Sequence, residues 1–128
     1  MSISDIPLLI QMTNSIGIDI VDVKDFKKRI KRTFPLKKRL FTEYEVSYCS
    51  KKGIEHLAGR FAVKEAFAKA CNLNNLSWGD VEVRNLPSGK PYLVINQRVK
   101  NKLKIKDVEI SISHTKHIAV GVVMLSIK

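Results

Sequence analysis

The segment that most constrains the fold is residues 54–71, IEHLAGRFAVKEAFAKAC. At about 100° per residue, its apolar side chains form a wide arc, and further apolar residues lie on the opposite side. The arc consists of Ala62, Val63, Ala66, Phe67 and Ala70. A helix with so little polar surface has to be covered on most of its circumference, so this segment predicts a long, central helix.

A carboxylate interrupts this apolar helix. On the helical wheel Glu65 lies between Phe61 and Lys69. One interpretation is a surface pair between Glu65 and Lys69 at spacing i, i+4, worth about 0.2–0.5 kcal/mol. The other is a carboxylate that faces a cleft and needs a cation or hydrogen-bond donors to offset its desolvation. The helix alone is compatible with both interpretations.

A second isolated acid lies in residues 15–23, SIGIDIVDV, whose period of two predicts a strand with one buried face. We expect the buried face to be the one that carries Ile16, Ile18 and Ile20. Asp19 then projects from the opposite face, where Gly17 permits close approach of another backbone. A solvated acid on an edge strand explains Asp19 equally well. Together, however, Asp19 and Glu65 suit Mg²⁺, which commonly takes one or two protein carboxylates.

Residues 22–35 change to a helical period. Asp22 or Asp25 can cap the start of this helix, and Pro35 ends it. The apolar stripe of the helix consists of Phe26, Ile30 and Phe34. The basic residues around the stripe are Lys24, Lys27, Lys28, Arg29, Lys31 and Arg32.

The remaining elements follow from capping and alternation. Residues 42–45 match a capping box, which begins a short helix that ends by Gly53. Two strands surround a glycine-containing turn within residues 80–96, a short helix covers 97–103, and the last strands span 108–113 and 117–125. Helices therefore concentrate in the first half and strands in the second, which indicates an α+β fold. We expect one domain over residues 15–128, with residues 1–14 as a loose N-terminal extension.

The chain is strongly basic, with a net charge of +11 over 128 residues. Such a charge implies an anionic partner, which is nucleic acid, a membrane surface, an acidic protein or a phosphate-bearing ligand, and charge alone does not choose among them. Motifs that read nucleic-acid bases are absent from the sequence, and no apolar run is long enough to span a membrane. Neither Cys49 nor Cys71 belongs to a CxxC pattern, so reduced thiols and a cytoplasmic location are expected.

A possible phosphate-binding motif, SISHTKH, ends the strand at 108–113. A single histidine is more often structural than functional. Here the flanking hydroxyls of Ser113 and Thr115 and the following Lys116 favour phosphate binding by His114. His117 lies three residues further on and would point to the opposite face of an extended strand, which argues against a zinc pair.

Five motifs in this order, GIDIVDV, RLFTEYEVSYC, LAGRFAVKEAFAKA, SGKPYL and SISHT, resemble the holo-(acyl-carrier-protein) synthase family of small phosphopantetheinyl transferases. The resemblance implies a Mg²⁺-dependent enzyme that transfers 4′-phosphopantetheine from coenzyme A to a serine of apo acyl carrier protein and releases adenosine 3′,5′-bisphosphate. It also implies an antiparallel sheet packed with a long central helix, and a cytoplasmic homotrimer with active sites at the subunit interfaces.

By motif position, the resemblance implies that Asp19 and Glu65 are the metal ligands and that Lys69 acts beside the pyrophosphate. It places Arg60 and His114 near the 3′-phosphate of coenzyme A. Lys64 is a further candidate for neutralising phosphate charge. The complete set of predicted coenzyme-binding residues is Lys51, Arg60, Lys64, Gly89, Lys90, Pro91, His114 and Thr115.

One position departs from the family pattern, which usually has an arginine six residues after the metal aspartate. This chain has Asp25 there, and nearby basic residues are expected to contact the acidic carrier protein instead. They are Lys24, Lys27, Lys28 and Arg29. The alternative function is a basic nucleic-acid-binding module without enzymatic activity, but such a module has no need of Asp19 and Glu65 in apolar surroundings.

Overall fold

A computed structural model describes residues 14–32 and 36–128. Its main sheet is antiparallel, with strand order β1-β5-β4, and β2 and β3 form a separate hairpin. The elements in chain order are β1 (Ser15–Asp22), α2 (Val23–Arg32), α3 (Leu36–Leu40), α4 (Glu43–Cys49), α5 (Ile54–Ala70), η2 (Trp78–Asp80), β2 (Val81–Asn85), β3 (Pro91–Ile95), α6 (Gln97–Lys102), β4 (Ile105–His114) and β5 (Ile118–Ile127). The predicted α+β architecture is confirmed.

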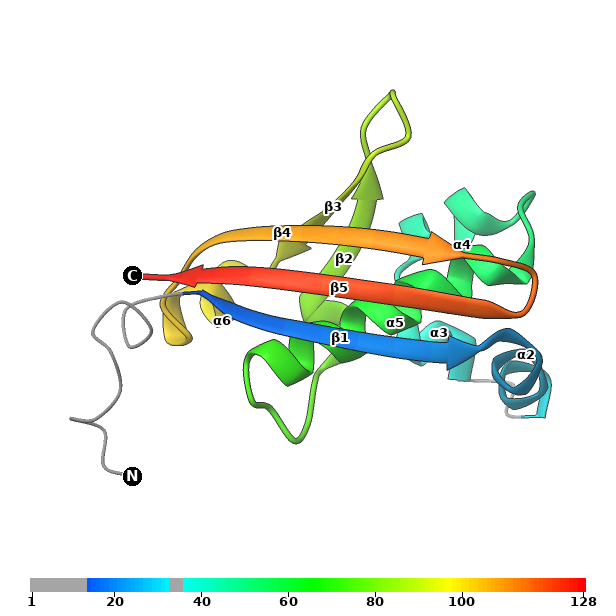
Figure 1. The fold of residues 1–128 in the computed structure, drawn as a ribbon, viewed down its shortest axis with the longest axis horizontal. Helices are drawn as coiled ribbons and strands as arrows, with labels where there is room; N and C mark the ends of the chain where they lie inside the picture. The colour runs from blue at the N-terminus through cyan, green and yellow to red at the C-terminus, as the bar shows by residue number, and fades with distance from the viewer. Residues whose placement is uncertain (1–13, 33–35) are drawn as a thin grey trace.

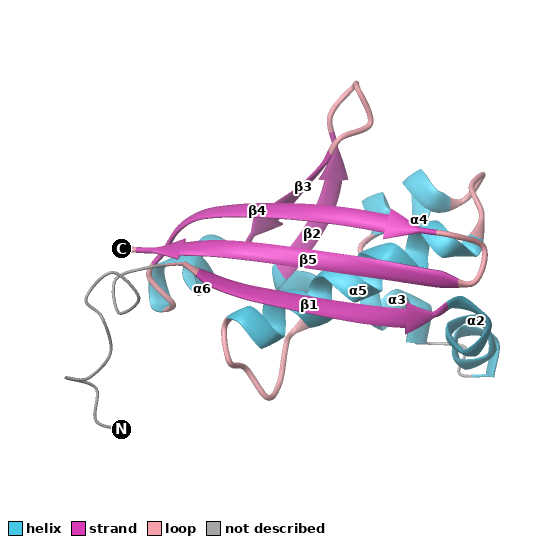
Figure 2. Ribbon diagram, in the orientation of Figure 1, coloured by secondary structure: helices cyan, strands magenta, loops and turns pink. Residues whose placement is uncertain are grey.

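The long helix α5 lies against one face of the three-stranded sheet, behind it in the view of Figure 1. The helices α2, α3 and α4 gather toward one end of the sheet, α6 lies at the opposite end, and the β2–β3 hairpin projects beyond the sheet (Figure 2). The apolar arc of α5 is buried against the strands, as its pattern predicts. Because α5 contacts all three strands of the sheet, charged residues along it can line pockets near either edge of the sheet.

Two glycines set how closely α5 approaches the sheet. A Cβ added at Gly17 of β1 would lie 1.9 Å from the Ala66 carbonyl oxygen, and one at Gly121 of β5 would lie 2.5 Å from the Val63 nitrogen. These contacts are too short for any side chain, so only glycine permits this packing. The glycine-bearing face of the sheet is therefore the inner face.

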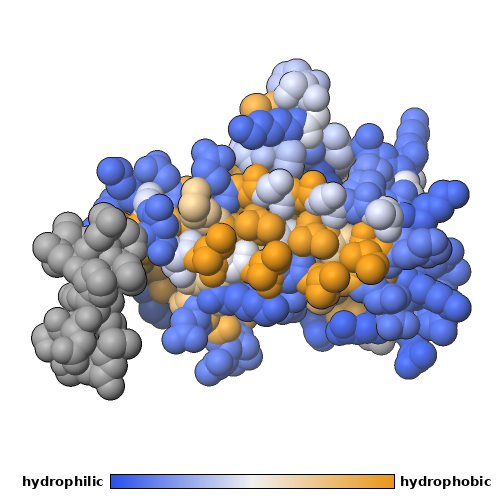
Figure 3. All heavy atoms as spheres, in the orientation of Figure 1, coloured by the Kyte–Doolittle hydropathy of each residue, from blue (hydrophilic) through white to orange (hydrophobic). Residues whose placement is uncertain are grey.

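The predicted orientation of β1 is wrong. Ile16, Ile18 and Ile20 are 69%, 60% and 66% exposed, whereas Gly17 and Val21 on the other face are buried. The reason is the close approach of α5, which leaves room for Gly17 but not for a row of isoleucines. These isoleucines form an apolar patch, here called the isoleucine face, which crosses the sheet in Figure 3 and comprises Ile16, Ile18, Ile20, Ile118 and Met124.

Local signals located several element boundaries correctly. The predicted capping box is present, because the Thr42 N–H donates to Glu45 Oε1 at 2.9 Å and the Glu45 N–H donates to Thr42 Oγ1 at 3.3 Å. Asp22 caps α2 by accepting from the Asp25 N–H at 2.9 Å. The short elements α3 and η2 were not predicted. Residues 1–13 of the expected extension, together with Phe34 and Pro35, lie outside the described residues.

Candidate active site

Where β1 meets α5, the structure brings together the three residues that the resemblance assigns to catalysis. Lys69 Nζ lies 2.9 Å from Asp19 Oδ1 and also donates to the Ile18 carbonyl oxygen at 3.1 Å. Asp19 and Glu65 line one open cleft, here called the carboxylate cleft. Its other lining residues are Ile20, Val21, Asp22, Asp25, Phe26, Arg29 and Phe61.

The electrostatics of this cleft favour a bound cation. Burial and the neighbouring charge of Asp19 raise the pKa of Glu65 above its ordinary value, and Lys69 and Arg29 only partly oppose this shift. Two carboxylates that repel one another are stabilised when a cation binds between them. The described residues contain no group of three or more histidine, cysteine, aspartate or glutamate side chains suited to a metal ion. Two carboxylates nevertheless fit Mg²⁺, because phosphate oxygens and water complete its coordination.

Helix α2 borders the carboxylate cleft with both signs of charge. The Arg29 guanidinium lies 5.8 Å from the centre of the Phe61 ring, and Arg29 and Asp25 both line the cleft. Lys24, Lys27 and Lys28 are exposed on the same helix. The basic surface of α2 therefore begins at the rim of the cleft, with Arg29 as its nearest member.

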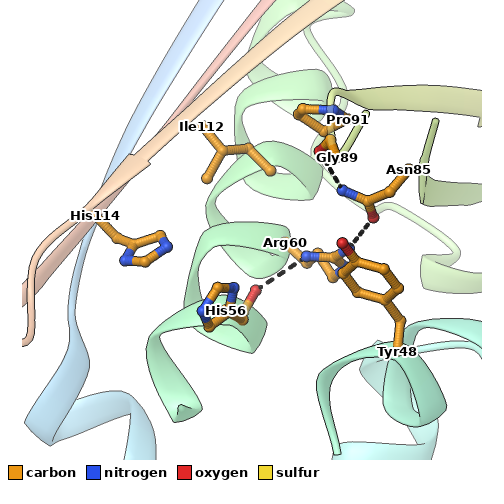
Figure 4. Close-up of a pocket in the computed structure, with 8 residues that line it drawn as sticks. All are labelled: Tyr48, His56, Arg60, Asn85, Gly89, Pro91, Ile112 and His114. Carbon is orange, nitrogen blue, oxygen red and sulfur yellow. Dashed lines mark hydrogen bonds between the residues drawn. The ribbon is translucent and has the colours of Figure 1, made fainter. Parts of the chain in front are cut away.

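A second pocket, here called the polar pocket, lies between α5, the end of β4 and the β2–β3 hairpin (Figure 4). Its lining residues are Tyr48, His56, Arg60, Asn85, Gly89, Pro91, Ile112 and His114. It thus contains four of the predicted coenzyme-binding residues: Arg60, Gly89, Pro91 and His114.

Arg60 is the buried cation of the polar pocket, with 3% of its surface exposed. Its Nη2 donates to Asn85 Oδ1, and its Nη1 donates weakly to the His56 carbonyl oxygen at 3.4 Å. The guanidinium lies 4.8 Å from the centre of the Tyr48 ring. Within the described residues, Arg60 Nε is buried and lacks a hydrogen-bond partner. A buried donor of a permanently charged group favours an anionic ligand.

Lys64 requires a correction. It was predicted to bind the coenzyme, but it is 0% exposed and forms an ion pair with Glu45 at 2.7 Å. Its Nζ also donates to the carbonyl oxygens of Leu40 at 2.8 Å and Trp78 at 3.1 Å. An ammonium group has three donors, and all three are used inside the protein. Lys64 therefore stabilises the fold and is not available to a ligand.

Three further predicted residues lie outside the lining of both pockets. Lys51 and Lys90 are exposed in turns. Thr115 Oγ1 accepts from the N–H groups of His117 at 3.0 Å and Ile118 at 3.1 Å, so Thr115 shapes the β4–β5 turn behind His114. The structure therefore gives Thr115 a supporting position rather than a place in the pocket wall.

The sequence reasoning missed Tyr48, His56, Asn85 and Ile112 as pocket residues. His56 could have been found, because it lies four residues before Arg60 and therefore on the same face of the helix. The other three depend on contacts between distant segments, such as the hydrogen bond from Arg60 to Asn85.

The two pockets lie toward opposite edges of the sheet. Asp19 belongs to β1 at one edge, whereas Ile112 and His114 belong to β4 at the other edge, and β5 separates the two strands. The carboxylate cleft offers a place for a cation and the polar pocket a place for an anion.

Comparison with known proteins identifies relatives over most of the chain. Residues 15–122 match the model of the 4′-phosphopantetheinyl transferase superfamily. A holo-(acyl-carrier-protein) synthase of Chloroherpeton thalassium is 41% identical over 116 residues, covering 86% of this chain and 95% of the relative. One from Geobacter metallireducens is 42% identical over 118 residues, covering 85% and 94%.

Two solved structures are similar in fold as well as in sequence. The Helicobacter pylori holo-(acyl-carrier-protein) synthase in complex with coenzyme A has a TM-score of 0.80 and 33% identity, covering 87% of this chain and 99% of that one. The Bacillus anthracis enzyme, in complex with coenzyme A (3′,5′-ADP), has a TM-score of 0.76 and 35% identity, covering 91% and 99%.

Proposed function

The chain belongs to the 4′-phosphopantetheinyl transferase superfamily, and we propose that it transfers 4′-phosphopantetheine from coenzyme A to a serine of apo acyl carrier protein. The products are holo acyl carrier protein and adenosine 3′,5′-bisphosphate. The observation that carries this proposal is the carboxylate cleft, which Asp19 and Glu65 line beside a basic helix, with Lys69 paired to Asp19.

In this reaction the serine oxygen forms a bond to the phosphorus that carries pantetheine, and the bond from that phosphorus to the bridging pyrophosphate oxygen breaks. Asp19 and Glu65 would hold Mg²⁺, which supplies charge neutralisation at the pyrophosphate when it is bound. Lys69 lies within reach of the same groups and contributes a further positive charge. Transfer of this kind depends mainly on positioning and on stabilising charge.

The serine hydroxyl has to lose its proton as the new bond forms. We propose that one of the cleft carboxylates, Asp19 or Glu65, accepts this proton through a water molecule.

The polar pocket is proposed to bind the 3′-phosphate of coenzyme A through Arg60 and His114. The buried Arg60 Nε has no partner among the described residues, which supports this assignment, because a phosphate oxygen would accept its hydrogen bond. Gly89 has a φ of 95° and places the turn between β2 and β3 beside the same pocket. The adenosine part of the coenzyme would lie along this turn.

Because the two pockets lie toward opposite sheet edges, we propose that one active site combines the carboxylate cleft of one subunit with the polar pocket of its neighbour. The exposed isoleucine face supports association, since apolar patches of this kind commonly become buried in interfaces. A homotrimer is the assembly that the family resemblance implies. An Ile18→Lys variant should dissociate in light-scattering measurements, and an unchanged assembly would count against the isoleucine face as the interface.

The basic surface of α2 is proposed to dock the acidic carrier protein beside the cleft, with Arg29 closest to the reacting groups. The proposed location is the cytoplasm, which is consistent with the free thiols of Cys49 and Cys71. Among the described residues, no helix combines the length and apolar character needed to cross a membrane.

The proposed function is tested by incubating the protein with coenzyme A, Mg²⁺ and apo acyl carrier protein. The intact mass of the carrier should increase by one phosphopantetheine group, and EDTA should prevent the increase. An unchanged carrier mass would contradict the transferase function. Salt-sensitive binding of nucleic acid by the same preparation would then favour the non-enzymatic alternative.

A further inference from the structure

The polar pocket contains two histidines that face each other. The ring centres of His56 and His114 are 4.6 Å apart, and the rings meet edge to face at 66°. His56 comes from the first turn of α5 and His114 from the last position of β4. Figure 4 shows both side chains on the same side of Arg60. The third histidine of the chain, His117, does not line this pocket.

His56 lies in a positively charged environment even without a ligand. The charged or titratable groups that act on it are His114, Lys52 and Arg60, with Glu55 as the only acid among them. Burial lowers the pKa of His56, and His114 adds to this shift, whereas Glu55 opposes it. At neutral pH the free protein therefore holds His56 mainly as the uncharged imidazole.

The pocket also has a free donor beside the histidines. Arg60 is one helical turn from His56, and its Nε is buried without a partner in the described part of the chain. The positive end of the helix dipole of α5 lies at its first turn, which carries His56. The N-cap residue, Gly53, adds no side-chain cap hydrogen bond there. An anion that reached Arg60 Nε would therefore enter a region where the two facing imidazoles, His56 and His114, are the neighbouring titratable groups.

We propose that His56 is a proton-coupled specificity residue for coenzyme A, which takes up a proton from solvent when a phosphate monoester binds among His56, His114 and Arg60. The inference rests on the proposed function and adds to it, because His56 is assigned no role by the resemblance. The proton moves from solvent to an imidazole nitrogen, and no covalent bond of the coenzyme changes.

The chemistry of coenzyme A explains why this proton would confer specificity. Its 3′-phosphate is a monoester whose second ionisation lies near about pH 6, so it is mainly a dianion at neutral pH. Its pyrophosphate is esterified at both ends and carries one charge per phosphorus. A nearby dianion favours the imidazolium form of His56. Coenzyme A should therefore draw a proton into the pocket, whereas 3′-dephospho-coenzyme A should not.

The sign of the pH dependence follows from this linkage. The His56 proton is lost more easily from the free protein than from the complex, so the affinity for coenzyme A should rise as the pH falls from about 8 to about 6.5. Below about pH 6 the phosphate loses its second charge and the advantage declines. The affinity for 3′-dephospho-coenzyme A should vary much less over this range.

The test is calorimetric titration of the intact protein with coenzyme A and with 3′-dephospho-coenzyme A. Runs in two buffers with different ionisation enthalpies give the number of protons taken up. For the wild type we expect proton uptake on binding coenzyme A and none on binding 3′-dephospho-coenzyme A. His56→Gln should reduce that uptake by about half or more and reduce the preference for coenzyme A about tenfold at pH near 6.5, with a smaller effect near pH 8.

Two further variants separate proton coupling from packing. His56→Phe keeps an aromatic ring against His114 and should show the same losses as His56→Gln. His117→Gln removes a histidine outside the pocket and should match the wild type. Unchanged proton uptake in both His56 variants, or an equal loss of affinity for the two coenzymes, would overturn the inference. A wild-type protein that binds neither coenzyme would instead refute the proposed function.

Discussion

Lys64 and Glu65 are consecutive residues of α5, but they meet opposite environments. Lys64 is 0% exposed and uses its three donors on Glu45, Leu40 and Trp78. Glu65 faces the carboxylate cleft, where its nearest charged neighbours include Asp19, which repels it. The helical rotation between neighbouring residues directs one charge inward and the other toward a ligand site.

The difference between them lies in hydrogen-bonding capacity rather than in charge. Glu45 accepts from Lys64, from the Thr42 N–H and from the Val83 N–H, so the buried pair links α4, α5 and β2 and uses both carboxylate oxygens. Within the described residues, Glu65 has no comparable set of hydrogen-bond donors, so it keeps its capacity to bind a cation. A charged residue in a central helix therefore indicates function only when its partners are incomplete.

The largest expected effect is on stability, from Lys64→Met. This change leaves Glu45 as a buried, uncompensated charge and should cost about 3–5 kcal/mol of the free energy of unfolding. Lys69→Met is the matched control on the same helix. Since the Lys69 side chain is 56% exposed, it should cost less than about 0.5 kcal/mol.

Urea unfolding of both variants measures the difference in their free energies of unfolding. An activity assay then distinguishes the two lysines by their role in transfer. Lys69→Met should reduce turnover about a hundredfold while the fold remains stable, because its charge acts on the phosphates. Equal stability losses in Lys64→Met and Lys69→Met would show that the buried ion pair of Lys64 stabilises the fold no more than the exposed ion pair of Lys69.

The next largest effect concerns the carrier protein. Reversing Lys27, Lys28 and Arg29 to glutamate should raise KM for the acyl carrier protein about tenfold, with a much smaller change in KM for coenzyme A. Steady-state kinetics with each substrate varied in turn measures both constants. An equal rise in the two would argue against a dedicated carrier surface on α2.

A smaller effect is expected from Asp25→Arg, which introduces the arginine that the family resemblance implies at this position. Asp25 lines the carboxylate cleft beside Arg29, so an arginine side chain at position 25 should extend the basic surface of α2 toward the carrier. We expect KM for the carrier to fall about two- to threefold. A rise in KM would indicate that Asp25 itself contributes to binding.

The smallest effect is the pH dependence of stability in metal-free protein. The raised pKa of Glu65 means that the folded state binds this proton more tightly than the unfolded state, so stability is lost as pH rises above the ordinary value of 4.5. Glu65→Gln removes this loss. In EDTA the variant should therefore melt about 1–2 °C higher than the wild type at neutral pH, and the two should converge near pH 4.

Thermal melts across this range make the comparison. A variant that melts lower than the wild type at neutral pH would show that the Glu65 carboxylate has stabilising partners in the fold. Added Mg²⁺ should raise the melting temperature of the wild type more than that of the variant, because a ligand that binds the native state stabilises it.

Much of the fold could be predicted because its signals are local. The capping box at Thr42, the cap at Asp22 and the apolar arc of α5 each depend on residues within a few positions of one another. Strand β1 was located correctly, but its faces were reversed, since hydrophobicity alone cannot distinguish a core from an exposed apolar surface. Gly17 and Gly121 carry the missing signal, because they mark where the helix backbone touches the sheet.

The functional site was also partly predictable, because its residues lie in short motifs that can be recognised in the sequence. Family-like motifs identified Asp19, Glu65, Arg60 and His114, which line the two pockets. Lys64 was assigned wrongly because its partners are Glu45 and two backbone carbonyl groups that the sequence does not show as neighbours. These contacts are created by tertiary packing.

The most direct test of this account measures the intact mass of apo acyl carrier protein after incubation with coenzyme A, Mg²⁺ and the Glu65→Gln variant. We expect no added phosphopantetheine under conditions in which the wild type converts the carrier completely, and circular dichroism should show the variant to be folded. Conversion at the wild-type rate would contradict the account, because Glu65 would then be a surface charge without a role in transfer.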